Sequence, residues 1–294
     1  MFKHIKNKKL RIFIIIMIIV FILSIITYYV LNNLKFRYRS FYDVGEELVL
    51  DKTYNTIFSE INIETKMSDL NIKYSNDNSI KVMVYGEKDY INLIEKNNKL
   101  YIDIKEKNFI AFNFYNHISK IEIYLPNWYK NLIRIDSEYG NIDIEEFNDS
   151  TFYVEQEYGN ILSKGSNFIK VKNEYGDVEL LKANKARIVA ESGDVKIGTI
   201  KNLEVENEYG DISIQNVTEY LKLNNDMGDI NINKLNIEED SFITLEHGDI
   251  KIDDINQIYV DAKTDHGDVD IKVNYEQANI VLSIYNEMGD IKID

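Results

Sequence analysis

The sequence predicts an all-β fold, a β-solenoid of stacked 17–22-residue coils preceded by one N-terminal transmembrane helix. One phrase recurs nine times between Glu138 and Ile291: an acid, any residue, glycine, Asp or Asn, and a branched apolar residue. Apolar and polar residues alternate on both sides of each glycine, and a long apolar run lies near the N-terminus. A fixed period in this range indicates stacked units that bury their apolar faces against one another.

The apolar run covers residues 12–31 and contains no charged side chain. At about 1.5 Å per residue it spans roughly 30 Å, the thickness of a bilayer core. A cleavable signal peptide would have an apolar region of about 7–15 residues followed by small residues, whereas this run continues through Tyr28 and Tyr29 into Asn32. We therefore expect residues 12–31 to form an uncleaved helix that anchors the protein in a membrane.

Charge predicts the orientation of this helix. The first 39 residues hold eight basic side chains and no acidic one, and five of the eight lie within 1–11. The positive-inside bias places such a cluster in the cytoplasm, although Lys35, Arg37 and Arg39 on the far side oppose it. We expect a single-pass cell-membrane protein with a cytoplasmic tail at 1–11, a stalk at 32–50 and an extracytoplasmic C-terminal domain.

Composition limits the partners of that domain. Residues 40–294 carry 26 of the 34 basic residues and all 49 acidic ones, so nucleic acid, whose phosphates would be repelled, is excluded as a partner. The chain contains no cysteine, which excludes disulfides and thiolate metal sites. A domain of this length is expected to hold together through its apolar core alone.

Residues 51–130 are strand-like but irregular, and we expect them to form the N-terminal strand-rich part and cap of the solenoid. Met67-Ser68-Asp69, with apolar residues alternating on both sides, is interpreted as a degenerate coil with serine in the glycine place. The alternation continues in three further runs, Lys81–Tyr85, Leu100–Ile104 and Ile118–Leu125.

Residues 131–294 form the regular part. Five residues before each glycine the side chain is apolar in all nine repeats, and two residues after it the side chain is always β-branched, as expected of strands that alternate faces. Glycine in the third place of a turn such as Glu174–Asp177 fits a type II turn with positive φ. The constant period favours a solenoid over a meander of hairpins. The repeat glycines are Gly140, Gly159, Gly176, Gly193, Gly210, Gly228, Gly248, Gly267 and Gly289.

Two further features concern the interior and the end of the stack. Asparagines three residues before the glycine, on the inward face, are predicted to bond coil to coil: Asn173, Asn207, Asn225 and Asn286. The coil 282–294 ends inside a repeat with no cap after it. We expect an exposed strand edge on this C-terminal coil and self-association through it.

The string Ile121–Pro126, followed by Leu132–Ile135 and then by glycine repeats with an acid or amide and a branched apolar residue, resembles a known bacterial family. It is similar to the putative-adhesin β-strand-repeat domain of unknown function, over about residues 50–294. The resemblance implies a right-handed β-solenoid on the bacterial envelope, often behind an N-terminal membrane segment, with some members among envelope-stress genes. The family has no accepted catalytic residues to transfer to this chain.

Stacking would turn the acids of the repeats into two columns along one edge. One column lies two residues before the glycines and runs from Glu138 to Glu287, and the other directly follows them and runs from Asn141 to Asp290. Neighbouring carboxylates about 4.8 Å apart could bind divalent cations, and one hypothesis is therefore a Ca²⁺-stabilised rod. The alternative is that Asp and Asn close the turns by bonding nearby backbone.

The place just before the glycine suggests two further sites. Tyr139, Tyr158, Tyr175 and Tyr209 occur there, and a column of tyrosines could stack sugars. His247 and His266 follow in successive repeats, so two stacked imidazoles could share a metal. The alternative to both is that these side chains simply project outward at a turn.

Solenoid enzymes gather unlike acidic and basic residues in one cleft, whereas this chain repeats the same residues evenly. We therefore expect no enzyme and assign no catalytic, cofactor-binding or metal-binding residue. The predicted function is a cell-envelope protein that presents an acidic solenoid for surface binding, adhesion or scaffolding, in connection with envelope stress. Its ligand would be an unknown surface component, a glycan or a protein. The alternatives are a carbohydrate-active enzyme and the Ca²⁺-stabilised rod.

Overall fold

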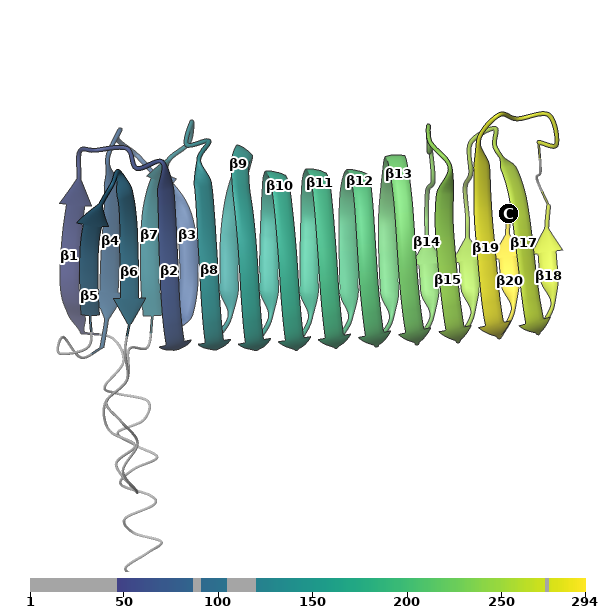
Figure 1. Ribbon diagram of the computed structural model, residues 1–294, viewed down its shortest axis with the longest axis horizontal. Coiled ribbons are helices and arrows are strands. Elements are labelled where there is room, and N and C mark those ends of the chain that lie inside the picture. Colours follow the sequence, from purple (N-terminus) through teal and green to yellow (C-terminus); the bar gives the residue numbers. More distant parts are fainter. Residues whose placement is uncertain (1–46, 87–90, 105–119, 273–274) are drawn as a thin grey trace, which may run out of the picture. The chain divides into compact units, whose positions relative to one another are not determined.

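The computed structural model describes residues 47–86, 91–104, 120–272 and 275–294 (Figure 1). The chain divides into two compact units, Met1–Glu47 and Leu48–Asp294, and every described strand belongs to the second. The predicted tail 1–11, transmembrane helix 12–31 and most of the stalk 32–50 lie outside the described residues. The residues that are described contain no helix of the length and apolarity needed to cross a membrane. Strand β1 begins at Leu48, so the last three residues of the predicted stalk are strand.

The second unit is an all-β solenoid, as predicted. Five long strands form its middle, each starting two residues after one corner and ending just before the next glycine: β9 (Ile142–Tyr158), β10 (Ile161–Tyr175), β11 (Val178–Ser192), β12 (Val195–Tyr209) and β13 (Ile212–Met227). They pair in parallel along their lengths. The start of β9 pairs with β3 (Asp69–Ser75) and its end with β8 (Leu132–Tyr139), so each long strand bends and serves two faces.

The core lies between the two faces. The β-branched residue two places after the glycine is at most 1% exposed in eight of the nine repeats, and Val269, at 41%, is the exception. The apolar residue five places before the glycine is likewise buried in every repeat except that of Ala262, which is partly buried. Both exceptions belong to one coil, which indicates that this coil lies at the end of the stack.

The repeat glycines form a single sharp corner in each coil. Their φ angles lie between +124° and +157°, so the predicted positive φ is confirmed, but these angles are far from the roughly +80° of a type II turn. A Cβ atom on any of these glycines would lie 1.9–2.4 Å from a carbonyl oxygen of the adjacent coil's corner. The corner therefore requires glycine for its backbone angle and also for the close stacking of successive coils.

The N-terminal part contains the predicted degenerate coil and a cap. β2 (Glu60–Met67) and β3 flank Ser68, and Gly140 stacks directly on this serine. On their other side, β2 pairs with β6 (Lys99–Ile104) and β3 with β7 (Lys120–Pro126). Antiparallel strands close this end: β4 (Ile80–Tyr85) lies on β7, β1 (Leu48–Tyr54) on β4, and β5 (Ile91–Lys96) on β6.

The C-terminal coils are stacked out of sequence order. The last seven strands are β14 (Ile230–Ile232), β15 (Ser241–His247), β16 (Ile250–Ile252), β17 (Tyr259–His266), β18 (Val269–Ile271), β19 (Val281–Met288) and β20 (Ile291–Ile293). β19 lies between β15 and β17, and β20 lies between β16 and β18. The coil of β17 and β18 thus precedes the coil of β19 and β20 in the sequence but lies outside it in the stack (Figure 1).

The observed order of the coils shows that the free strand edge predicted for the C-terminal coil is wrong. The C-terminal coil 282–294 is paired on both sides, and at this end of the described solenoid the edge without a further neighbour belongs to β17 and β18. The physical reason is apolarity: Leu282, Ile284, Ile291 and Ile293 are all buried, whereas the end coil places Ala262 and Thr264 at inward positions. The more apolar coil gains more from burial on two sides.

Candidate functional site

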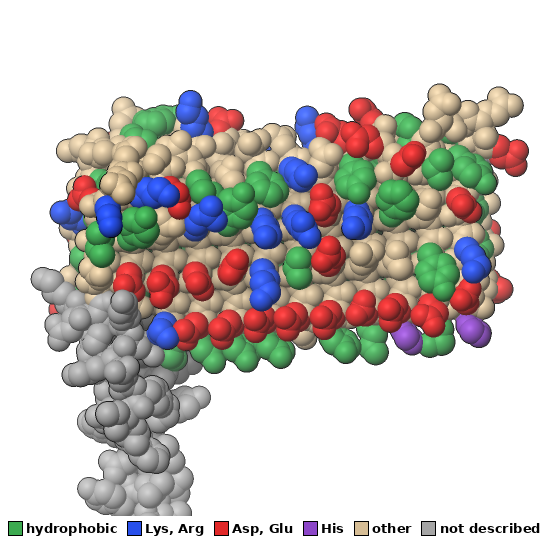
Figure 2. Space-filling model, in the orientation of Figure 1, with side chains coloured by type: hydrophobic (Ala, Val, Ile, Leu, Met, Phe, Trp, Pro, Cys, Tyr) green, Lys and Arg blue, Asp and Glu red, His purple; other side chains and the backbone are tan. Residues whose placement is uncertain are grey.

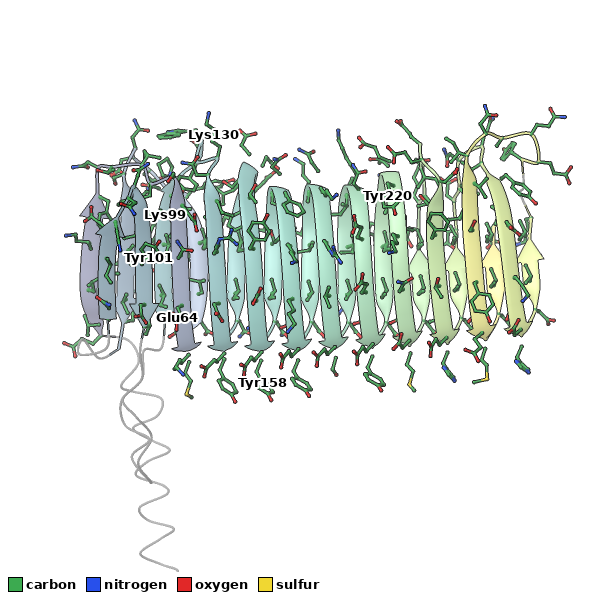
Figure 3. All side chains as sticks on the ribbon, viewed as in Figure 1. Glu64, Lys99, Tyr101, Lys130, Tyr158 and Tyr220 are labelled. Carbon is green, nitrogen blue, oxygen red and sulfur yellow. The ribbon has the colours of Figure 1, made fainter. Side chains whose placement is uncertain are left out.

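The glycine corners place one side chain of each coil on the same edge of the solenoid (Figure 3). We call this set the corner row. In stacking order it consists of Met67, Tyr139, Tyr158, Tyr175, Ser192, Tyr209, Met227, His247, Met288 and His266. All four tyrosines and all three methionines are exposed, and Tyr209, at 54%, is the most exposed of them. The corner row is therefore a band of large, mostly apolar side chains in contact with solvent, and Ser192 and the two histidines are its other members.

Three tyrosines of the row stack face to face. The rings of Tyr139 and Tyr158 lie 4.8 Å apart at an interplanar angle of 5°, and those of Tyr158 and Tyr175 lie 4.9 Å apart at 6°. Loss of surrounding water, followed by the neighbouring tyrosines and glutamates, raises the pKa of Tyr158. Because each ring covers the face of the next, these three side chains present edges and hydroxyl groups outward. Between Tyr139 and Tyr175 no ring face is therefore free for the predicted stacking of sugars.

The two histidines of the row are not neighbours. Met288 lies between His247 and His266, since the C-terminal coil is inserted between the coils that carry them. The hypothesis of two stacked imidazoles sharing a metal is therefore wrong. It assumed that successive repeats in the sequence are successive coils in space, which does not hold at this end.

The acid or amide column directly after the glycines is a hydrogen-bond ladder. Each side-chain Oδ1 accepts the backbone N–H of the corresponding residue in the next coil, over 2.8–3.2 Å. The ladder starts at Asp69 and ends at Asp268. These side chains do bond backbone, as the alternative to a Ca²⁺ site predicted, but the backbone belongs to the neighbouring coil, so they join successive coils and do not close their own turns. Because these Oδ1 atoms already accept hydrogen bonds, they are not free ligands for the Ca²⁺ of the sequence-based hypothesis.

The second acidic column, two residues before the glycines, is solvent-facing. Acidic side chains form a row beside the hydrophobic side chains of the corner (Figure 2). Some have lysine partners, such as Glu138 with Lys66 at 2.7 Å, whereas Glu191 and Glu208 have no ion pair within the described part of the chain. The same described residues contain no group of three or more His, Asp or Glu side chains placed to hold a metal ion. The corner row is thus flanked by negative charge.

Buried amides hold the corners from inside. Asn173, Asn207, Asn225 and Asn286 are at most 3% exposed, as the inward pattern predicts. Their Nδ2 atoms mostly donate to carbonyl oxygens of the corner glycines, for example Asn173 to Gly176 at 2.7 Å. Among the described residues one bond joins two of these amides directly, from Asn207 to Asn225 at 2.9 Å. The amides therefore fix the corner geometry, and with it the spacing of the corner row.

Glu122 on β7 is the one charged side chain that is buried among the described residues. Lys73 lies 2.8 Å and Lys120 3.2 Å from its carboxylate, and the hydroxyls of Tyr85 and Tyr124 donate to it at 3.1 Å. Burial by itself would raise the pKa of Glu122, but these partners outweigh it and lower the pKa to about 2. A carboxylate held ionised in this way stabilises the N-terminal part and is poorly suited to proton transfer.

The tyrosines and histidines of the corner row were predicted from the sequence, whereas its three methionines and Ser192 were not. Alignment on the glycines contains the signal for Met227, Ser192 and Met288, because each directly precedes a repeat glycine. The position of Met288 between the two histidines can be recognised only when the order of the coils in space is known. As a whole the site is a long, mostly apolar band between acidic side chains. This arrangement can bind a partner, and no single coil carries a distinct set of reactive side chains.

A family model described as Toastrack DUF4097 matches residues 58–294. Among solved structures, a putative adhesin from Bacteroides fragilis NCTC 9343 is 17% identical, with 85% of this chain and 99% of that chain covered and a TM-score of 0.45. A putative lipid binding protein from Parabacteroides distasonis ATCC 8503 is 12% identical, with 83% and 96% covered and a TM-score of 0.48. No curated protein matches the chain.

Proposed function

The chain belongs to the Toastrack DUF4097 family, as its resemblance predicted, and from this premise we propose that it is a non-enzymatic, single-pass cell-envelope protein. Residues 12–31 anchor it in the membrane, and the acidic solenoid stands outside for surface binding, adhesion or scaffolding. The corner row is its binding surface, and the partner is a component of the cell surface.

One observation carries this proposal: large apolar side chains stay exposed at the same place of successive coils. At about 4.8 Å per coil the ten positions of the corner row extend over roughly 43 Å. Contiguous exposed apolar surface on a soluble domain marks an interaction site. Coil stacking relies on the glycine, the inward residues and the Asp and Asn ladder, so the tyrosines and methionines are not needed for the fold.

The flanking acids add selectivity. A partner that approaches the corner row meets carboxylates on both sides, which favours cationic groups and disfavours anionic polymers. The even repetition of the row suits an extended partner, since each coil offers a similar contact and the contacts add along the rod. This arrangement supports binding by the whole edge in preference to binding in one pocket.

The proposal is tested by site-specific photo-crosslinking in intact cells that carry the full-length protein. A photoreactive residue at Tyr175, in the corner row, is expected to crosslink to envelope components. The control is Leu181, on the next strand, β11, and outside the corner row, because the two side chains are similarly exposed, at 47% and 42%. Crosslinks that form equally from both positions, or from Leu181 alone, would contradict the role of the corner row.

A further inference from the structure

We propose that the corner row contains a site for a trimethylammonium group, located where Ser192 interrupts the tyrosines. This inference rests on the proposed role of the corner row and names the chemistry that one part of it recognises. Tyr175, Ser192 and Tyr209 are neighbours in register, one on each of three successive coils. The small serine leaves a space between two aromatic side chains, which we call the Ser192 gap.

The spacing of the coils sets the width of the gap. Stacked rings elsewhere in the row lie 4.8–4.9 Å apart, one coil step. Two steps place the rings of Tyr175 and Tyr209 roughly 9.6 Å apart. A cation midway would lie about 4.8 Å from each ring, inside the roughly 6 Å range of cation–π attraction.

The size of the gap selects a methylated nitrogen. Methyl carbons about 1.5 Å from the nitrogen would bring the group within roughly 3.5–4 Å of both rings, which is van der Waals contact. A primary ammonium group is smaller and more strongly hydrated, so it would leave space for water on both sides. The gap therefore fits a trimethylammonium group better than a lysine-type ammonium group.

Charge beside the gap has the correct sign. Glu191 immediately precedes Ser192, Glu208 immediately precedes Tyr209, and neither forms an ion pair with the described residues. Asp194 follows the corner, and Lys196 lies 3.7 Å from its carboxylate, which leaves the surroundings net negative. The same acids would repel a phosphate, so choline itself is expected to bind more tightly than phosphocholine.

No other place in the described corner row has this arrangement. Tyr158 is covered on both faces by Tyr139 and Tyr175, and the outer neighbour of Tyr209 is Met227. The histidines are separated from each other by Met288. Two aromatic side chains on either side of a small residue occur at Ser192 alone among these ten positions.

The test measures ligand binding to the full-length chain in maltoside micelles by saturation-transfer NMR. The probes are choline, phosphocholine, ethanolamine, which carries a primary ammonium, and 3,3-dimethylbutan-1-ol, the neutral analogue of choline. We expect choline to bind with a Kd of about 1 mM. Ethanolamine and the neutral alcohol are expected to bind at least about 10-fold more weakly, and phosphocholine more weakly than choline.

Two variants locate the site. Ser192→Tyr fills the gap with a residue that four other coils carry at this place, and choline affinity is expected to fall at least about 10-fold with no loss of thermal stability. Tyr209→Leu removes one wall and should weaken choline binding by about 5-fold. Tyr139→Leu, three coils from the gap, is the matched control and should leave choline binding unchanged.

The proposal is overturned if choline binds Ser192→Tyr as well as it binds the unaltered chain, if ethanolamine or phosphocholine binds as tightly as choline, or if Tyr139→Leu weakens binding as much as Tyr209→Leu. Absence of choline binding together with retained crosslinking at Tyr175 would reject the Ser192 gap and leave the proposed function intact. Choline binding without crosslinking at Tyr175 would support the gap and reject the wider role of the corner row.

Discussion

Replacing Gly193 with alanine is expected to lower the free energy of unfolding by at least about 3 kcal/mol, because two costs combine. The φ angle of Gly193 is +140°, in a region that L-residues avoid. The new Cβ atom would also lie 2.2 Å from the carbonyl oxygen of Gly176. That oxygen belongs to the backbone of the next corner, so relief requires the two coils to separate. Thermal and denaturant unfolding of Gly193→Ala measure the effect.

Gly165→Ala provides the matched control. Gly165 has no positive φ, and its Cβ atom would meet the side chain of Glu146 in place of backbone; this side chain is 44% exposed and can shift at the cost of its bonds to Asn148 and Lys182. We expect a change within about 1 kcal/mol. Equal destabilisation by the two substitutions, or none from Gly193→Ala, would show that the corners are not the tightly stacked turns described above.

A pair of cysteines is expected to report the coil order in an all-or-none manner. Thr244 and Tyr285 are register partners on adjacent strands, as are Tyr285 and Lys263. Thr244 and Lys263 are therefore two coil steps apart, roughly 9.6 Å, beyond the about 7 Å limit for a disulfide. Because the natural chain has no cysteine, Thr244→Cys combined with Tyr285→Cys should oxidise to a disulfide without competing thiols.

The comparison variant combines Thr244→Cys with Lys263→Cys, the two positions that would be neighbours if the coils followed sequence order. Mild oxidation should leave this pair reduced, as measured by the gel mobility of the unfolded chain. Tyr285→Cys with Lys263→Cys is a second positive pair. Rapid disulfide formation between positions 244 and 263 would refute the insertion of the C-terminal coil.

The interior of the solenoid could be predicted from the sequence because each coil repeats the same physical requirement. Glycine forms the corner, the β-branched residue after it enters the core, and in five of the nine repeats an amide three residues before it bonds a corner from inside. A substitution in one coil changes little of this pattern. Ser68 in the glycine place could be recognised as a corner because the alternation around it was intact.

The order of the end coils could not be predicted from the repeat. The spacing from Gly248 to Gly267 is 19 residues and that from Gly267 to Gly289 is 22, and both allow ordinary consecutive stacking. Parallel pairing bonds backbone to backbone, so the repeat itself does not choose between neighbours. The end coil differs from the coil inside it in its inward residues Ala262 and Thr264, which are less apolar or smaller. This small difference favours the end position for that coil.

The candidate site was partly predictable for the same reasons. Alignment on the glycines places Tyr139, Tyr158 and Tyr175 in one column, but the parallel stacking that hides their faces depends on side-chain rotamers, which spacing does not encode. His247 and His266 were assumed to be neighbours, which is wrong because the C-terminal coil lies between their coils. The ladder of Asp and Asn was foreseen as turn closure, whereas its partners in the neighbouring coil become visible only when the coils are stacked.

The proposed function requires the solenoid to stand outside the membrane, and thiol labelling of intact cells measures on which side it lies. A single cysteine is placed in the otherwise cysteine-free chain at Lys6, in the predicted cytoplasmic tail, or at the exposed Leu181 of the solenoid. We expect a membrane-impermeant maleimide to label Leu181→Cys in intact cells and to label Lys6→Cys only after permeabilisation. Labelling of Lys6→Cys in intact cells, with Leu181→Cys protected until the membrane is opened, would contradict the proposed function.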